Sequence, residues 1–299
     1  MNPLHGLSAR AARVVVAAAM LSGIAGVHAA SSADELPERV TFASADGQTT
    51  LVGYLFGPEG PRSAPMPAVV MMHGRAGAYS SAANGKYDAS TLSRRHQEWG
   101  RIWARQGYLA LLVDGFGPRG YPHGFPRFSY DSRPEALNEV TVRPLDAYGA
   151  LAYLRTRSDV AGDRIALQGW SNGGSAALAT MSRTAPGIDS PTPATGFRAA
   201  LVFYPACGLK GQFNDGVLPY APVRVFQGSA DEEVSPRHCA ELVAKSRALG
   251  GDIAFQLYPE ATHDFDDPSP AHQDNDANAM ATEDAIARAT EFLARALRP

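Results

Sequence analysis

Short apolar runs recur along the chain, and most of them end at glycine or proline. Runs of this length, bounded by turn-forming residues, predict β-strands. Eight of them stand out, at residues 39–44, 50–57, 67–74, 108–115, 164–169, 198–206, 221–228 and 252–259. The turn sequence ADGQT joins the first two, which predicts an antiparallel start. The later runs are continuously apolar, as expected for strands covered on both faces.

Stretches with helical spacing separate most of the later runs. They cover residues 90–107, 134–157, 172–183, 235–251 and 278–297. In the first of them, Trp99, Ile102 and Trp103 fall near one face. In the second, Pro144 is expected to kink or divide the helix, because proline removes an interior hydrogen bond. Ser235 followed by proline is typical of a helix start.

The alternation of strands and helices predicts a single α/β domain over residues 31–299. Helix-connected strands give a mostly parallel central sheet with helices on both faces. Sheets of this kind place their functional groups at the carboxyl ends of the strands. Residues 115–134 follow neither pattern and are expected to form a long irregular loop.

The first 30 residues have the layout of a secretory signal peptide. They contain no acidic residue, and Arg10 and Arg13 precede an apolar run from Val14 to Val27. Small residues follow, which predicts cleavage after Ala29 or Ala30 and a periplasmic or secreted protein. The alternative is a membrane anchor, but spanning a bilayer takes about 20 apolar residues and this run has 14. No stable membrane association is expected after cleavage.

The charge of the chain bears on its possible partners, and its two cysteines bear on a possible disulfide. The chain carries 27 basic and 30 acidic residues, and residues 31–299 retain 25 and 30 of them, a net charge of −5. No basic patch stands out, so nucleic acid is not an expected partner. Cys207 and Cys239 both follow predicted strands at one edge of the sheet, and in an exported protein they are expected to form a disulfide. Two buried free thiols are the alternative.

The sequence GWSNG at residues 169–173 matches the G-x-S-x-G pattern. A predicted strand ends at Gly169, and a predicted helix begins just after Ser171. This is the context of a nucleophile elbow, in which a strained strand-to-helix turn exposes a serine hydroxyl above the sheet. Glycines at the flanking positions let neighbouring backbones approach the turn. A glycine-rich helix cap is the alternative interpretation.

A nucleophilic serine needs a base and an acid, which follow it along the chain in this fold. His263 follows the last predicted strand and is the candidate base, with His272 farther along the same loop in reserve. Asp231 follows the preceding strand and is the candidate acid, with Glu232 second. The alternative is that both loops are merely solvated. An acid is needed to hold the imidazole in the correct tautomer.

Two backbone N–H groups are candidates for an oxyanion hole, those of Asn172 and Arg75. Trp170 and the Arg75 side chain are expected to flank the nucleophile. The Arg75 guanidinium either pairs with a substrate carboxylate or stays solvated. Phe116 and Arg119, on the long loop, either line a substrate cleft or pack the loop onto the domain.

Two other patterns do not predict cofactor sites. GFGPRG at residues 115–120 matches a dinucleotide fingerprint, but Pro118 interrupts it and no helix follows. The acids and histidines of residues 263–276 lack a metal-binding spacing, so a solvated loop is expected there and no metal.

Several motifs in series resemble the dienelactone hydrolase family of the α/β-hydrolase superfamily. They are MMHGRAG, GYLALLVDGFGPRG, RPLDAYGALAYLRTR, RIALQGWSNGG, GSADEEVSP and ATHDF. The resemblance implies a triad of Ser171, Asp231 and His263, no cofactor, and hydrolysis of ester or lactone bonds. The founding members carry cysteine where this chain has Ser171, so the family does not specify the substrate.

The sequence therefore predicts an exported serine hydrolase that acts on a small ester or lactone. A serine peptidase of the same superfamily is the alternative enzyme, and a non-catalytic binding protein on the same scaffold is the alternative outside enzymes.

Overall fold

Eight strands form one sheet in the part of the chain that the structure describes. The computed structural model describes residue 1, residues 35–60 and residues 64–299, and the predicted signal peptide lies almost entirely outside these residues. The strands are β1 (Glu38–Ala43), β2 (Thr50–Phe56), β3 (Met66–Met72), β4 (Leu109–Asp114), β5 (Val160–Trp170), β6 (Ala200–Phe203), β7 (Val223–Gly228) and β8 (Ile253–Tyr258). Residues Leu36–Pro299 form one compact unit.

The sheet is mostly parallel, as the sequence predicts. Its strand order is β1-β2-β4-β3-β5-β6-β7-β8. The pairs β1–β2 and β2–β4 are antiparallel, and all other neighbours are parallel. The strands β5, β6, β7 and β8 are therefore adjacent and end at the same edge, so the loops that follow them can meet.

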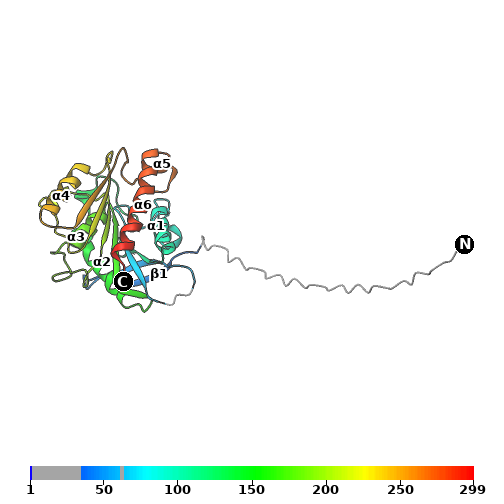
Figure 1. Ribbon diagram of the computed structural model, residues 1–299. Helices are drawn as coiled ribbons and strands as arrows, with labels where there is room; N and C mark the ends of the chain where they lie inside the picture. Colours follow the sequence, from blue (N-terminus) through cyan, green and yellow to red (C-terminus); the bar gives the residue numbers. More distant parts are fainter. Residues whose placement is uncertain (2–34, 61–63) are drawn as a thin grey trace. The chain divides into compact units, whose positions relative to one another are not determined.

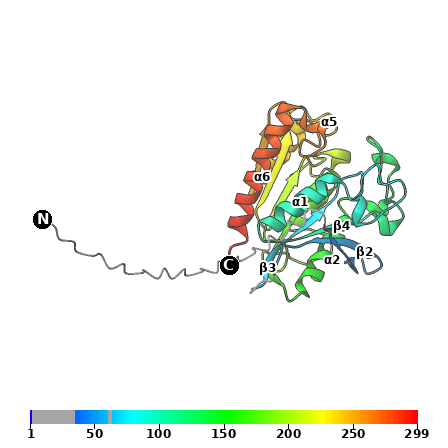
Figure 2. The same ribbon diagram turned by 90° about the vertical axis from the view of Figure 1, so that its right-hand side faces the viewer.

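Helices cover both faces of the sheet (Figures 1 and 2). The α-helices are α1 (Arg94–Arg105), α2 (Arg143–Arg155), α3 (Asn172–Met181), α4 (Pro236–Ala248), α5 (Pro270–Gln273) and α6 (Asp276–Ala296). Short 3-10 helices lie at Ala89–Thr91, Gly117–Arg119, Tyr130–Ser132, Glu135–Leu137 and Leu209–Gly211. Apolar side chains of α2, α3 and α4 pack on one face, and those of α1 and α6 pack on the other. None of the described helices is long and apolar enough to cross a membrane.

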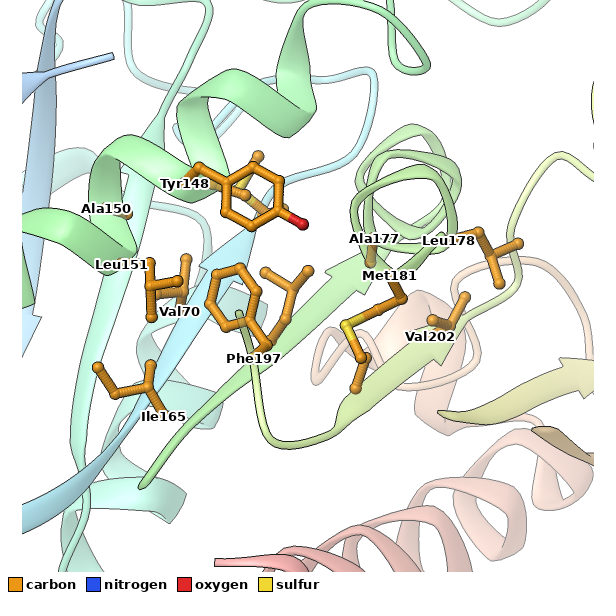
Figure 3. Packing of buried hydrophobic residues seen from close by; sticks show 14 of the residues in the cluster. Val70, Tyr148, Ala150, Leu151, Ile165, Ala177, Leu178, Met181, Phe197 and Val202 are labelled. Carbon is orange, nitrogen blue, oxygen red and sulfur yellow. The ribbon is translucent and has the colours of Figure 1, made fainter. Parts of the chain in front are cut away.

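The side chains between α2, α3 and the sheet form a dense apolar cluster (Figure 3). The rings of Tyr148 on α2 and Phe197 lie 5.9 Å apart. Leu151, Met181 and Val70 belong to the same cluster, and each is at most 2 % exposed. Burying a side chain of this size contributes roughly 1.5–3 kcal/mol. Because α3 begins directly after Ser171, this packing also fixes the position of that residue.

Pro144 begins a helix instead of kinking one. The helix α2 starts at Arg143, with Pro144 in its first turn. Proline fits there because the first N–H groups of a helix have no acceptor within it. The preceding residues, expected to be helical, contain the 3-10 turn at Glu135–Leu137. Of the two expected effects the kink is wrong, whereas the predicted helix is indeed divided, just before Pro144, and the irregular segment after β4 extends to residue 142.

Cys207 and Cys239 are joined by a disulfide, with their Cα atoms 5.0 Å apart. Cys207 lies in the loop after β6, and Cys239 lies in the first turn of α4. The bond therefore connects the loop next to the nucleophile elbow with the helix that follows the loop of Asp231.

Candidate active site

Ser171 occupies a strained turn between β5 and α3. Its φ angle is 51°, in a region that non-glycine residues rarely adopt. The Ser171 N–H donates to the carbonyl oxygen of Phe203 on the neighbouring strand, at 2.9 Å. Strain of this kind persists only where the surrounding structure enforces it. Here the strand before Ser171, the helix after it and the hydrogen bond to β6 all hold the turn.

The glycines around Ser171 provide the space that the turn requires. A Cβ atom added to Gly173 would lie 2.1 Å from the carbonyl oxygen of Met72, and one added to Gly169 would lie 2.1 Å from that of Gly173. A Cβ added to Gly74 would lie 3.5 Å from the Cβ of Ser171. Backbone atoms cannot move aside as a flexible side chain can, so the interpretation of the flanking glycines from the sequence is confirmed for Gly169 and Gly173.

Ser171, His263 and Asp231 form a continuous hydrogen-bonded series. The Ser171 Oγ atom lies 3.2 Å from His263 Nε2, and His263 Nδ1 lies 2.8 Å from Asp231 Oδ2. An ionised carboxylate can only accept, so Nδ1 carries the proton and Nε2 is free to accept from the serine hydroxyl. Ser171 is 4 % exposed and His263 is 1 % exposed. The series can thus move a proton away from the hydroxyl with little interference from water.

The Asp231 carboxylate is held firmly by residues of its own loop and by one side chain of β7. Its Oδ1 atom accepts the N–H groups of Glu233 and Val234, both at 2.9 Å. Its Oδ2 atom also accepts from the Gln227 side chain at 2.7 Å. Glu232, the second candidate acid, accepts the backbone N–H of His263 at 3.1 Å. Glu232 therefore holds the loop of His263, whereas Asp231 is the residue bonded to its ring.

The other two downstream histidines lie outside this series. The Nδ1 atom of His272 is 3.1 Å from the hydroxyl of Ser269, and His272 belongs to the short helix α5. His238 lies on α4, next to Gly208.

Opposing effects set the pKa of His263. Burial lowers it, but the charges of Asp264, Asp231 and Glu233, with the hydrogen bond to Asp231, raise it by more. The net result is a pKa above the ordinary histidine value. Sequence reasoning did not assign Glu233 to the site, although one of its oxygens lies 3.8 Å from His263 Nε2.

The backbone beside Ser171 supplies the two candidate oxyanion donors. Asn172 is the first residue of α3, and the first N–H groups of a helix have no acceptor within it. Arg75 follows Gly74, which packs against the elbow. His73 holds this turn: its Nδ1–H donates to the carbonyl of Gly74 at 2.7 Å, and its Nε2 accepts the N–H of Gly115 at 3.3 Å. Burial keeps the pKa of His73 well below its ordinary value, so the ring stays neutral.

Arg143 is a further buried residue next to the elbow. It is 0 % exposed, and its Nη1 atom donates to the side-chain oxygen of Asn172 at 2.5 Å. Its guanidinium lies 5.0 Å from the ring centre of Phe116. Burial lowers the pKa of Arg143 to about 10, so it stays charged at neutral pH. In the sequence Arg143 lies within the predicted helix of residues 134–157, which gives no sign of this contact.

The Arg75 side chain is paired within the chain. Its guanidinium forms a two-point ion pair with Glu233, with Nη2 at 3.0 Å from Oε2, and donates to the carbonyl of Phe125 at 3.0 Å. Arg127 also pairs with Glu233, at 3.2 Å. The loop after β4 is thereby tied to the loop of Asp231. The sequence left open whether this guanidinium pairs with a substrate carboxylate or stays solvated. In the structure it does neither, because it is paired with Glu233.

The other candidate substrate contacts are also engaged internally. Arg119 pairs with Asp146 at 2.8 Å and with Asp46 at 2.9 Å, because these carboxylates lie beneath the start of the long loop. Phe116 is 0 % exposed, with its ring 4.5 Å from that of His73. Trp170 is 0 % exposed and points to the face covered by α1. These three side chains pack the domain and do not line an open cleft.

Residues 263–267, the first part of the acidic segment after β8, are largely buried, which contradicts the solvated loop predicted there, whereas Asp274 and Asp276 are exposed as expected. Asp264 and Asp267 pair with Arg95 of α1 at 2.9 and 3.2 Å, and Asp266 is 4 % exposed. The positive charge that makes this possible comes from a distant part of the sequence. Within the described ranges, no cluster of His, Cys, Asp or Glu is arranged to hold a metal ion.

The chain is similar to known proteins both in sequence and in structure. The sequence model of the dienelactone hydrolase family matches residues 51–297. Esterase 2 of Thermogutta terrifontis, phosphorylated by paraoxon, is similar in structure with a TM-score of 0.62 at 19% identity, over 89% of this chain and 97% of the esterase. A dienelactone hydrolase-like promiscuous phosphotriesterase, P91, from metagenomic libraries gives 0.64 at 18% identity, over 88% and 100%. No curated protein matches the sequence.

Proposed function

Because this chain belongs to the dienelactone hydrolase family and is a carboxylic ester hydrolase, we propose that Ser171, His263 and Asp231 are its catalytic residues. We also propose that it is exported and that its substrates are small esters or lactones. The observation that carries the proposal is the hydrogen-bonded series from Ser171 Oγ through the imidazole to Asp231. A serine hydroxyl is a weak nucleophile without such a base.

The first half of the reaction forms an acyl-enzyme. Ser171 Oγ attacks the acyl carbon while its proton moves to His263 Nε2, and Asp231 stabilises the imidazolium that results. The N–H groups of Asn172 and Arg75 hold the oxyanion of the tetrahedral intermediate. Loss of one such donor costs about 3 kcal/mol in barrier. Collapse breaks the bond to the alcohol oxygen, which takes the proton from His263.

The second half restores the enzyme. His263 accepts a proton from water, and the hydroxide attacks the acyl carbon. The second tetrahedral intermediate releases the carboxylic acid, and the proton returns to Ser171 Oγ. With a lactone the alcohol stays attached to the acyl group, so the product is one hydroxy acid.

Ester turnover tests the proposed nucleophile. We expect the protein to hydrolyse p-nitrophenyl butyrate, and Ser171→Ala to lower kcat/KM by roughly 10,000-fold or more, because removal of a triad nucleophile leaves only residual catalysis. Ser182→Ala, at the far end of α3, is the matched control and should keep the wild-type rate. Equal rates for wild type and Ser171→Ala would refute the proposal.

An organophosphate distinguishes the alternatives. Paraoxon phosphorylates the Thermogutta esterase, and we expect it to transfer its diethylphosphoryl group to Ser171 with release of p-nitrophenolate. Intact-mass measurement and peptide mapping would detect the adduct. Absence of labelling would favour the binding-protein alternative, and cleavage of aminoacyl anilides but not esters would favour the peptidase.

Export is the remaining part of the proposal. It is supported by the acid-free, apolar character of residues 1–30 and is compatible with a disulfide, which persists in oxidising compartments. Mass spectrometry of the protein expressed at full length in a Gram-negative host should find a mature form beginning at residue 30 or 31 in the periplasm. An uncleaved chain in the cytoplasm would contradict this.

A further inference from the structure

A single buried carboxylate connects the nucleophile elbow with the loop of the base. The Oδ2 atom of Asp266 accepts the indole N–H of Trp170, the residue before Ser171, at 2.7 Å. The same oxygen accepts the indole N–H of Trp99 on α1 at 2.8 Å. The other oxygen, Oδ1, accepts the hydroxyl of Tyr204.

Tyr204 carries this connection to the imidazole. Its ring is fully buried, and its centre lies 4.7 Å from that of His263. Tyr204 directly follows β6 and has a φ angle of 35°, which is unusual for a bulky side chain. The N–H of Tyr204 donates to the carbonyl of Phe226 on β7 at 2.7 Å. The strained backbone and the bond to Asp266 together hold the ring against His263.

Arg95 fastens the loop of the base to α1. Its guanidinium pairs with Asp264 at 2.9 Å and Asp267 at 3.2 Å, and its Nε atom lies 3.4 Å from Asp266 Oδ1. It also lies 5.9 Å from the ring centre of Tyr204. Asp264 and Asp266 are close in sequence to His263, so this cluster restrains the backbone on which the imidazole is carried.

A buried carboxylate at residue 266 is unexpected if its only role is to stabilise the fold. A buried charge is costly, and a buried ion pair can often be replaced by apolar residues without loss of stability. Asp266 instead receives three hydrogen bonds from side chains of three separate segments, namely α1, β5 and the residue after β6. Two of those side chains adjoin the residues of the proposed proton transfer. An interaction that fixes these residues relative to each other affects the rate even where it adds little to stability.

We propose that Asp266 is a positioning residue, which holds Trp170 and Tyr204 so that Ser171 and His263 keep their hydrogen-bond distance. This inference rests on the proposed function of Ser171 and His263. Tyr204 and Arg95 support it in the same network. The Tyr204 ring restrains the imidazole of His263, and Arg95 compensates the negative charge of Asp266.

The substitution Asp266→Asn tests the inference with minimal change in volume. The introduced amide keeps one oxygen for the two indole N–H groups, but its NH2 group cannot accept from Tyr204 and does not attract Arg95. We expect kcat for p-nitrophenyl butyrate to fall about 30-fold while KM stays within about twofold, as for a small misplacement of reacting groups. The rate of phosphorylation by paraoxon should fall in parallel.

The second variant, Tyr204→Phe, keeps the ring and removes only the hydroxyl. We expect it to lower kcat by about fivefold, and the double variant to be no slower than Asp266→Asn alone, because coupled residues are not additive. The matched control is Asp284→Asn on α6, since Asp284 likewise accepts from a tyrosine, Tyr258, and an arginine, Arg288. It should keep the wild-type kcat.

The outcomes separate this inference from the proposed function. Activity in wild type and its loss in Ser171→Ala test the function without reference to Asp266. Wild-type kcat in Asp266→Asn or in Tyr204→Phe would then overturn the positioning role alone. So would losses that multiply in the double variant, or a rise in KM in place of a fall in kcat. If Asp266→Asn does not fold, Tyr204→Phe still gives the decisive measurement.

Discussion

His263 is the residue of the site whose protonation depends most on neighbouring charges. It is almost completely buried, and burial alone would favour the neutral ring. Carboxylates face it from both sides, Asp231 at Nδ1 and Glu233 near Nε2, and Asp264 adjoins it in sequence. Their charges outweigh burial and raise the pKa of His263. The base therefore binds its proton more tightly than a free histidine, which favours proton removal from Ser171.

This balance predicts how activity depends on pH. We expect kcat/KM to rise with pH through a limb whose midpoint lies above the ordinary histidine pKa of 6.5, because only the neutral ring can act as base. The effect on stability has the opposite sign. A raised pKa stabilises the folded protein below the unfolded-state pKa, and this contribution is lost as pH rises through the folded-state value. Both predictions can be tested between pH 5 and 9, about the range in which histidine titrates. The pH profile of kcat/KM tests the effect on activity, and urea unfolding tests the effect on stability.

Glu233→Gln is the variant that checks the cause. It removes one of the charges that raise the pKa of His263, so the midpoint of the limb should move to lower pH. An unchanged midpoint would show that Glu233 does not act on the imidazole. Glu59→Gln, in a loop outside the candidate site, serves as the comparison.

At the scale of elements, the elbow depends on how closely β5, α3 and the loop after β3 approach one another. Gly169, Gly173 and Gly74 lie where these backbones touch, and two of the three leave no room for a methyl group. Glycine lowers helix stability by about 1 kcal/mol relative to alanine. At Gly173, which lies within α3, the close approach therefore outweighs helix propensity.

Gly173→Ala should reverse the usual benefit of alanine in a helix. The added Cβ would lie 2.1 Å from the carbonyl oxygen of Met72, and we expect a loss of roughly 3 kcal/mol in unfolding free energy, as for an overpacked core. Gly57→Ala is the control, because its Cβ would meet only Leu109 at the ordinary distance of 3.6 Å. Urea unfolding of both variants decides the matter, and equal stabilities would contradict this account of the elbow.

At the scale of the whole molecule, the order of strands brings the site together. Because β5, β6, β7 and β8 lie side by side and parallel, the loops of Ser171, Asp231 and His263 leave the sheet at one edge. Long-range ties then fix these loops to one another. The disulfide joins the loop after β6 to α4, and the pairs of Glu233 with Arg75 and Arg127 join the loop of Asp231 to two others.

The disulfide should contribute mainly to global stability. Cys207 and Cys239 are separated by 32 positions, and closing a loop of that length stabilises a fold by roughly 3–4 kcal/mol in the chain-entropy model. The double variant Cys207→Ser and Cys239→Ser should lose about this much unfolding free energy while keeping kcat within about twofold. Thiol titration of the unfolded wild type should find no free thiol before reduction. Two free thiols would refute the bond.

Local signals in the sequence were sufficient for the framework. Short apolar runs, most of them ended by glycine or proline, mark the strands, and Ser235 begins its helix as the sequence predicts. The same local rules misjudged the residues before Arg143, which were expected to be helical, because a proline that starts a helix and one that interrupts a helix look alike in the sequence. They also misjudged residues 263–267, since a run of acids looks solvated until its partner is known.

The sequence by itself determined the α/β sheet, the glycine-lined turn at Ser171 and the loops from which a base and an acid could come, because these features follow from chain order and from neighbouring residues. Only the tertiary structure decided which charges meet. Arg95 with the aspartates after His263, Arg75 with Glu233, and Asp266 with two indoles and a phenol are contacts between distant segments. Their energies depend on burial and on distances of a few ångströms, which no local pattern encodes.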